Sequence, residues 1–387
     1  MKVLHIISGG DTGGAKSHLI TLLSQMNRDK ADTGLSVTLL CLMEGDFARE
    51  AREAGIAVTV IEQTKRYDVF VARRIAKYAR ANGFDLLHFH GARANFVAVF
   101  IRLLLRRVPF CTTVHSDYML DFADSRYKQA LYMPINKFAL KRFKFILAMT
   151  ENMKRLLVSR GFREKRIHVV YNGIRTDGER AVVPKAEYLA RHGLTYDPDK
   201  LYVGIAARLQ KVKGIDVFLR GVKEAAEPLS NAVFLLAGDG TEREDCAAYI
   251  RDNDLGGRLT MLGHETDIFS FFNVLDINCL TSYSEGFPSS LLEGGMMEKA
   301  TISAACGGVP EMIGDGQSGI LFPIGDAHAF AEGLKRLAAD EGLRTRLGKA
   351  LRARVEREFS AKHMAKRHLA LYEQCLNEYA KKRSVRQ

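Results

Sequence analysis

The chain has 387 residues, of which 47% are hydrophobic and 26% are charged, a composition that excludes a disordered or low-complexity protein and a length that suits two domains. Its net charge of +12 is uneven: residues 1–180 hold 30 Lys/Arg against 17 Asp/Glu, residues 181–360 hold 20 against 26, and residues 361–387 hold 7 against 2. This asymmetry suggests that the first half and the C-terminal segment share a surface that faces an anionic partner.

The sequence predicts a cytoplasmic protein. No apolar run approaches the roughly 18 to 20 residues of a transmembrane helix. The N-terminal stretch MKVLHIIS meets two glycines too early for a signal peptide and is interpreted as a buried strand. The six cysteines are scattered without a CxxC pair, which predicts buried, reduced thiols.

In the first half, short runs of Val, Ile and Leu alternate with amphipathic helical patterns. The predicted strands are residues 3–8, 35–42, 58–61, 86–90, 110–115, 145–149 and 167–170, and helical patterns include residues 15–26, 69–81 and 125–142. Continuous apolar strands joined by helical crossovers indicate a parallel sheet that is covered on both faces.

After a polar stretch at 175–184 the alternation restarts. Further strands are predicted at residues 202–206, 233–237, 259–262, 276–280, 301–303 and 320–322. The fold class is therefore α/β, with two doubly wound, Rossmann-like domains at residues 1–180 and 181–361. A last helix within 362–387 is expected to cross back to the first domain. Because such sheets bind ligands beyond the carboxyl ends of their strands, the expected site is the cleft between the domains.

Several motifs of the first half allow more than one interpretation. The glycine-rich stretch 9–14 is either a tight turn or a loop that lets a ligand approach the following helix, where Lys16 and His18 face the ligand or are merely packed or solvated. His88 and His90 share one strand face, but without a third ligand at sensible spacing they favour packing or cleft-lining over a metal site. His115 ends a strand and is either a core or a functional histidine.

The second half holds more specific candidates. Arg208 follows a strand and Lys213 opens the next helix, an arrangement that suits a diphosphate; the alternative is a surface charge run that includes Lys211. The stretch 281–295, TSYSEGFPSSLLEGG, places Glu285 in a turn and Glu293 on the helix after it. Free amides and the helix dipole at this junction favour an anion, while the carboxylates can bind hydroxyls. A nucleotide sugar offers both groups.

These motifs, in this order, resemble retaining glycosyltransferase family 4. The resemblance runs from about residue 3 to residue 372, and its specific part is the pair of glutamates with seven residues between them. It is carried by Arg208, Lys213-Gly214, Gly238-Asp239-Gly240, Leu262-Gly263, Ser284-Glu285-Gly286-Phe287-Pro288, Glu293 and 307–311, with Gly13-Gly14 and His115 in the first half. The resemblance implies the GT-B fold, in which two Rossmann-like domains face each other across a cleft.

The resemblance also implies a role for each matching residue. Arg208 and Lys213 are expected to hold the donor diphosphate, Glu293 the ribose, and Glu285 the donor sugar. The backbone of Gly286, Phe287 and Pro288 is expected to lie against sugar and phosphate, with Gly14 and His115 contacting the donor from the first domain. No cofactor and no metal are expected, because Arg208 and Lys213 would offset the leaving-group charge that a Mg²⁺ otherwise offsets.

The implied activity is the retaining transfer of a hexosyl unit from a nucleoside diphosphate sugar, with UDP expected, to a sugar or lipid-linked acceptor in polysaccharide or glycolipid synthesis. A front-face mechanism is expected, because no carboxylate candidate stands on the first-domain side. Basic residues around the apolar stretch 96–105 suit docking on an anionic membrane surface, such as the inner face of the plasma membrane, or a core helix with a solvated end.

The alternatives are a UDP-sugar epimerase or hydrolase on the same fold, an NAD-dependent dehydrogenase, and a nucleic-acid binder. The dehydrogenase is disfavoured by the missing GxGxxG and ribose-binding acid, and the nucleic-acid binder by the lack of a motif. Two departures from the family pattern stand out. Lys16 occupies a position that is often acidic, and Glu298 and Ala300 replace a turn after Glu293.

Overall fold

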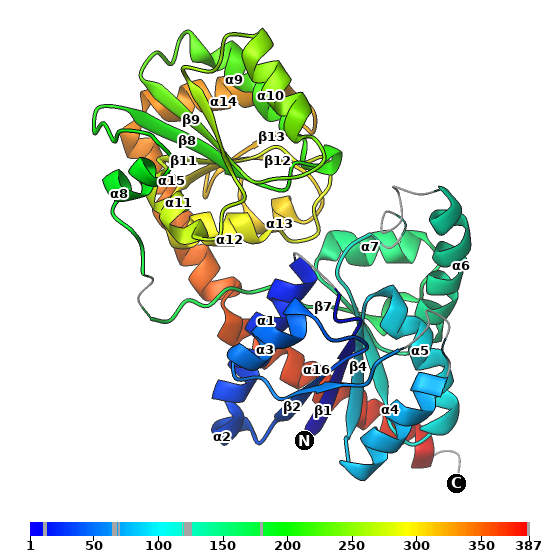
Figure 1. Ribbon diagram of the computed structural model, residues 1–387. Coiled ribbons are helices and arrows are strands. Elements are labelled where there is room, and N and C mark those ends of the chain that lie inside the picture. Colours follow the sequence, from blue (N-terminus) through cyan, green and yellow to red (C-terminus); the bar gives the residue numbers. More distant parts are fainter. Residues whose placement is uncertain are drawn as a thin grey trace. The chain divides into compact units, whose positions relative to one another are not determined.

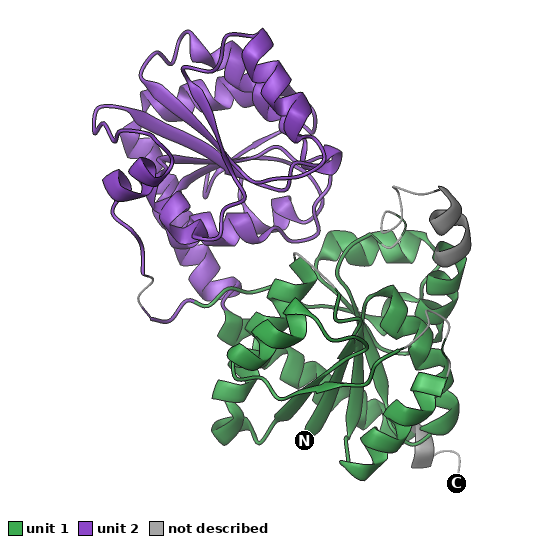
Figure 2. Cartoon of the chain, viewed as in Figure 1, with its two compact units in different colours: residues 1–175, 361–387 green, residues 176–360 purple. Residues whose placement is uncertain are grey.

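The computed structural model describes residues 1–10, 14–63, 68, 70–117, 119, 126–178 and 181–384, with the backbone alone at 126–132 and 382–384. The chain divides into two compact units (Figure 2). The first comprises Met1–Arg175 together with Ala361–Gln387, and the second Thr176–Ser360. Among the described helices none is both long and apolar enough for a membrane span.

The first unit is built on a parallel sheet whose described strands follow the order β3-β2-β1-β4-β5-β6-β7 (Figure 1). The strands are β1 (Lys2–Ile7), β2 (Ser36–Cys41), β3 (Val58–Val60), β4 (Leu86–His90), β5 (Phe110–Val114), β6 (Ile146–Ala148) and β7 (Ile167–Val169). Each lies within one or two residues of a predicted strand, because every one is a continuous apolar run between turn signals. The strand order reverses at the β1–β4 pair.

The helices of this unit follow the strands in alternation. They are α1 (Gly14–Arg28), α2 (Lys30–Thr33), α3 (Asp46–Glu53), α4 (Phe70–Ala81), α5 (Gly91–Leu104), α6 (Arg126–Arg142), α7 (Glu151–Ser159) and α16 (Ala361–Ser384), with a 3-10 turn at Glu164–Arg166. The helices predicted at 69–81 and 125–142 correspond to α4 and α6. Their first predicted residues, 69 and 125, lie outside the described residues.

Two hydrophobic clusters cover the two faces of this sheet. Alternate residues of a strand point to opposite faces: Leu4 and Ile6 of β1 join a cluster with α4 and α5, whereas Val3 and Ile7 join one with α1 and α16. The final helix α16 therefore packs on the first unit, where it lies against α1 and buries Tyr372 completely. This places C-terminal residues next to the N-terminal strand.

The second unit repeats the same design with the strand order β10-β9-β8-β11-β12-β13. Its strands are β8 (Leu201–Ala206), β9 (Ala232–Ala237), β10 (Leu259–Gly263), β11 (Ile277–Leu280), β12 (Ala300–Ala304) and β13 (Ile320–Phe322). Its helices are α8 (Lys185–Arg191), α9 (Ile215–Ala226), α10 (Arg243–Asp252), α11 (Ile268–Val274), α12 (Ser289–Met296), α13 (Val309–Met312), α14 (Ala327–Ala339) and α15 (Glu341–Glu358), with a 3-10 turn at Lys211–Lys213. All the described strand pairs are parallel, so all the strand ends that matter for a ligand lie at one edge.

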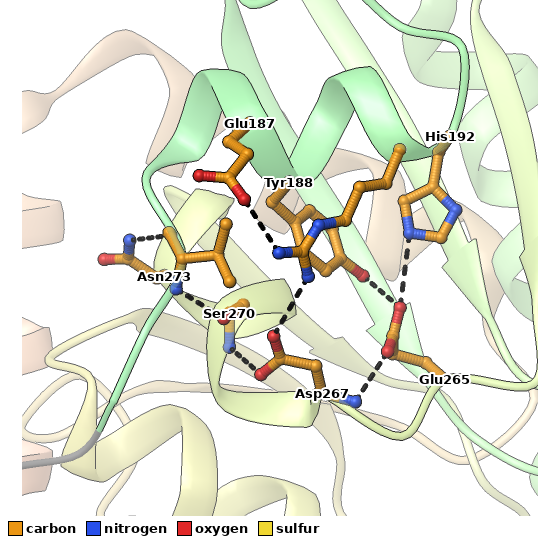
Figure 3. A network of polar contacts seen from close by, with 9 residues as sticks. Glu187, Tyr188, His192, Glu265, Asp267, Ser270 and Asn273 are labelled. Atoms are coloured by element: carbon orange, nitrogen blue, oxygen red, sulfur yellow. Dashed lines mark hydrogen bonds and ion pairs between the residues drawn. The ribbon is translucent and has the colours of Figure 1, made fainter.

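A polar network fixes the start of the second unit (Figure 3). The Tyr188 hydroxyl of α8 donates to the Glu265 carboxylate at 2.5 Å, and His192 lies 3.3 Å from the same carboxylate. The amide of Val183 donates to the Ser270 hydroxyl of α11 at 2.8 Å. Burial and the hydrogen bond to Glu265 raise the pKa of Tyr188, so the phenol remains a donor. The segment after the predicted linker is thus anchored to its own unit.

Candidate functional site

The most specific motifs meet at the carboxyl edge of the second sheet. Strand order reverses where β8 pairs with β11, because β9 lies on one side of β8 and β12 on the far side of β11. The loop with Arg208 and Lys213 follows β8, and the turn with Glu285 follows β11. Loops that diverge from such a reversal leave the crevice in which open α/β sheets bind ligands.

Lys213 and Glu285 form an ion pair across this reversal. The ammonium of Lys213 lies 2.7 Å from Oε1 of Glu285, which also accepts a hydrogen bond from the Ser282 hydroxyl at 2.6 Å. The side chains are only 20% and 8% exposed, respectively. An ammonium has three donors, so Lys213 can hold Glu285 and still contact an anion. The sequence proposed both residues but did not predict their contact.

Glycine allows the two loops to touch through their backbones. Gly214 adopts φ +60, and a Cβ there would lie 2.1 Å from the carbonyl oxygen of Thr281. The Thr281 hydroxyl in turn donates to the Gly214 carbonyl at 2.8 Å. Gly307, after β12, has φ +52, and its Cβ would lie 1.7 Å from the carbonyl oxygen of Glu285. The loops of β8, β11 and β12 therefore support one another around Glu285.

Replacing Gly307 by alanine is expected to destabilise the chain by about 2–5 kcal/mol. The left-handed backbone costs an L-residue about 1–2 kcal/mol, and forcing a methyl against the Glu285 carbonyl adds about 1–3 kcal/mol. Gly316→Ala is the matched control, since Gly316 has φ +67 but an added Cβ would meet nothing within 4 Å. Urea unfolding of both variants isolates the close approach. Equal midpoints would show that the Glu285 turn does not depend on Gly307.

The remaining candidates of the second unit lie on the same two loops and on α12. Arg208 is exposed, and its side chain has no hydrogen-bond or ion-pair partner within the described part of the chain. Glu293 is half-buried on α12. Phe287 is 9% exposed and packs its ring at 5.2 Å from that of Phe359, so that the body of its side chain belongs to the interior of the unit. Gly286 is half-buried beside it, and Pro288 takes the N-cap position of α12.

The candidates of the first unit lie at the corresponding edge of its own sheet. His115 follows β5 directly and is partly exposed, and Gly14 is the first described residue of α1. Lys16 forms an ion pair with Glu50 of α3 at 2.8 Å, so the charge that departs from the family pattern is neutralised locally. His18 does not face a ligand: it is 1% exposed and contacts the side chain of Asn172 at 3.0 Å. Of the two α1 side chains, His18 is thus a packed residue.

His88 and His90 are packed in the interior, as the sequence favoured, but a third histidine that the sequence spacing did not indicate lies with them. Strand register places His5 of β1 beside His88 of β4, and all three residues are fully buried. Their ligand atoms lie within 4.8 Å of one another. Burial lowers the pKa of each of these three side chains well below 6.5, so each is neutral. Sequence spacing missed His5 because it lies on another strand, and only the strand order brings it close.

Comparisons with known proteins match nearly the whole chain to glycosyltransferases. Residues 12–177 match the model of Glycosyltransferase Family 4, and residues 190–354 match that of Glycosyl transferases group 1. N-acetyl-alpha-D-glucosaminyl L-malate synthase of Bacillus anthracis is 23% identical over 79% of each chain. N,N'-diacetylbacillosaminyl-diphospho-undecaprenol alpha-1,3-N-acetylgalactosaminyltransferase of Campylobacter jejuni is 25% identical over 86% of this chain and 90% of its own. The crystal structure of Anabaena HepE in complex with UDP has a TM-score of 0.81, with 18% identity, over 97% of this chain and 100% of that one.

Proposed function

Because the chain belongs to glycosyltransferase family 4, we propose that it transfers a hexosyl unit from a UDP-sugar to a sugar or lipid-linked acceptor with retention of configuration. The chain has the GT-B fold, and it is a glycosyltransferase of polysaccharide or glycolipid biosynthesis. The relatives named above are a synthase and a transferase, which does not favour the epimerase or hydrolase. The observation that carries the proposal is the Lys213–Glu285 pair, with the exposed Arg208 on the same loop as Lys213.

The donor is assigned to the carboxyl edge of the second sheet. Arg208 and Lys213 would bind the diphosphate, since a guanidinium can contact two oxygens and an ammonium supplies a point charge. Glu293 would accept hydrogen bonds from the ribose hydroxyls, and Glu285 from hydroxyls of the sugar. HepE, which was crystallised with UDP, supports the choice of nucleotide. In the first unit, His115 would contact the donor sugar, and Gly14 would allow close approach of α1.

In the proposed reaction, Arg208 and Lys213 stabilise the departing UDP. Charge develops on the β-phosphate as the glycosidic bond breaks, and fixed cations in a partly buried site stabilise it without reorganisation. We propose that Arg208 and Lys213 provide the positive charge that stabilises the departing phosphate, and that no metal ion takes part. Retention would then follow from attack on the same face, with the leaving phosphate taking the proton of the acceptor hydroxyl. Mass spectrometry that traps a covalent glycosyl-enzyme during turnover would refute this mechanism.

A thermal-shift panel of UDP-, GDP- and ADP-sugars in the absence of metal tests the donor site. A bound UDP-sugar is expected to stabilise the chain by roughly 2.7 kcal/mol at 100 times Kd. Glu293→Ala and Arg208→Ala are expected to abolish the shift. Arg251→Ala, a change on the exposed surface of α10, should leave it intact. A wild-type response from both site variants would refute the assignment.

We also propose that the first unit docks on an anionic membrane surface. Leu103, Leu104 and Phe138 of α5 and α6 are 65%, 41% and 51% exposed, and these helices pack together. Exposed cations accompany them, and the guanidinium of Arg142 lies 4.4 Å above the Phe138 ring. The exposed basic residues nearby are Arg106, Arg107, Lys141 and Lys144. Apolar side chains framed by cations suit the boundary between headgroups and acyl chains.

Leu103→Ser combined with Phe138→Ser is expected to weaken binding to vesicles that contain anionic lipid at least tenfold. Wild-type binding should also fall steeply with salt, because exposed charges are screened over about 10 Å at 0.1 M. Phe70→Ser is the control, since Phe70 is 76% exposed on α4. Vesicle co-sedimentation measures all three proteins. Equal binding to neutral vesicles would contradict the proposal.

A further inference from the structure

A continuous chain of hydrogen bonds runs through the interior of the first unit to His115. Nε2 of His115 lies 3.1 Å from Nδ1 of His90, whose Nε2 lies 3.0 Å from Nδ1 of His5. Nε2 of His5 lies 3.3 Å from the hydroxyl of Tyr372 on α16, which crosses the sheet face that carries β1 and β4 (Figure 1). The connected residues come from strands and a helix far apart in the sequence.

At its inner end, this series of hydrogen bonds reaches a threonine. The Tyr372 hydroxyl lies 2.7 Å from Nδ1 of His88, and Nε2 of His88 lies 2.8 Å from the hydroxyl of Thr113 on β5. The two outer residues differ in environment: Thr113 is 2% exposed, whereas His115 is partly exposed at the carboxyl end of β5. Nδ1 of His115 has no hydrogen-bond partner within the described part of the chain.

The four histidines that the hydrogen bonds connect each carry one ring proton, because burial lowers the pKa of every one of them well below 6.5. A neutral imidazole donates through one nitrogen and accepts through the other. Each histidine therefore passes the direction of hydrogen bonding from one neighbour to the next. Tyr372 does so too, because a hydroxyl that accepted from both His88 and His5 would leave its own buried proton without an acceptor among the described residues. The five hydrogen bonds thus all point the same way, either from Thr113 toward His115 or in reverse.

The direction of the hydrogen bonds follows from whether every buried proton has an acceptor. If the chain points toward His115, the Thr113 hydroxyl donates to His88 and every buried proton has an acceptor. In reverse, His88 donates to Thr113 and leaves a buried hydroxyl proton without an acceptor among the described residues. The 2.7 and 3.3 Å distances at Tyr372 would slightly favour the reverse, but an unpaired buried donor costs more than one lengthened hydrogen bond.

We infer that this chain, from Thr113 through His88, Tyr372, His5 and His90, holds His115 with its proton on Nδ1, so that its one free ring nitrogen is a fixed hydrogen-bond donor. The inference rests on the proposed function for the role of that donor, which is to bind a hydroxyl or phosphate oxygen of the sugar nucleotide. The five interior residues are positioning residues. Through Tyr372, helix α16 takes part in orienting a side chain at the edge of the sheet.

A metal ion at His5, His88 and His90 is the competing use of these side chains. Their ligand atoms lie within 4.8 Å of one another. However, both ring nitrogens of every one of the three are already engaged in the hydrogen bonds described above. An ion would have to replace these bonds, whereas the proton chain satisfies them all.

Nitrogen NMR of the chain labelled with ¹⁵N-histidine tests the inference without substrate. All four chain histidines are expected to carry the proton on Nδ1, with a coupling across the hydrogen bond from Nδ1 of His90 to Nε2 of His115. His90→Leu removes the donor to His115 and is expected to move its proton to Nε2. It should also lower kcat on the order of tenfold, less than the 10²–10³-fold of deleting a transition-state donor outright, while the UDP thermal shift is unchanged.

Two variants separate positioning from packing. Phe89→Leu alters the same strand on its opposite, fully buried face, and should leave the His115 tautomer and kcat unchanged. His90→Gln should restore much of kcat, because its amide can accept from His5 and donate to His115. Wild-type His115 protonated at Nε2, equal kcat losses in His90→Leu and Phe89→Leu, or histidine shifts showing one bound Zn²⁺ after its addition would each overturn the inference. Loss of the UDP shift with the expected tautomers would refute the donor site alone.

Discussion

Lys213→Ala is expected to lower kcat by about 10²–10³-fold, whereas Lys211→Ala leaves it nearly unchanged. Removing one preorganised group that stabilises developing charge typically costs this much. Both lysines lie on the same 3-10 turn, but Lys211 is exposed and Lys213 is paired with Glu285. Steady-state transfer from a UDP-sugar measures the difference. Similar losses in the two variants would place the diphosphate elsewhere.

The control for Lys213→Ala must separate lost chemistry from an unpaired carboxylate. Truncating one member of a buried pair can cost about 3–5 kcal/mol, because the other charge is left without its partner; the partial exposure of Lys213 reduces this cost here. Lys213→Met combined with Glu285→Gln removes both charges and should recover most of the stability. Its kcat should remain low. Recovery of kcat together with stability would show that the pair is structural.

The candidate residues of this site could be named from the sequence, but the contact between Lys213 and Glu285 could not be predicted. Arg208, Lys213 and Glu285 stand at strand ends, where the alternation of apolar runs and glycines is locally encoded. That Lys213 meets Glu285 depends on β8 pairing with β11, although β9 and β10 lie between them in the sequence. Strand order is a property of the whole sheet, and no local pattern specifies it.

The histidine chain was missed for the same reason. His88 and His90 were identified on one strand face, but His5 joins them through the β1–β4 register and Tyr372 through the packing of α16. The ion pair of Lys16 could not be predicted either, because its partner Glu50 lies on α3. In each case the missing information was a tertiary neighbour, whereas the identity and place of each element followed from periodicity.

The first unit is expected to unfold on mild acidification, near pH 5, while the second remains folded. Burial lowers the pKa of His18 to about 4 and that of His368 to about 3, whereas an unfolded histidine titrates near 6.5. Each folded-state pKa is depressed, so the unfolded chain binds more protons below pH 6.5 and stability falls with pH. Lowering the pH from 7 to 5 removes about 4 kcal/mol through these two residues alone.

Further histidines of the same cluster act in the same direction. The pKa values of His5, His88, His90 and His115 are lowered by burial and then by neighbouring histidines. The stability lost when these four histidines become protonated on unfolding adds to the roughly 4 kcal/mol from His18 and His368. A domain is typically stable by only about 5–15 kcal/mol. The described second unit has no comparable cluster of buried histidines.

Hydrogen exchange followed by mass spectrometry resolves the two units, because peptides from each sheet are read separately. Peptides of β1, β4, β5 and α16 are expected to lose protection together between pH 6.5 and 5, whereas those of β8 and β11 keep it. His368→Gln should lower the number of protons taken up on unfolding by about one, because an amide does not titrate. Loss of protection in both units at the same pH would mean that another set of groups controls acid stability. Protection of α16 at pH 5 would mean that the histidine chain accepts protons without opening.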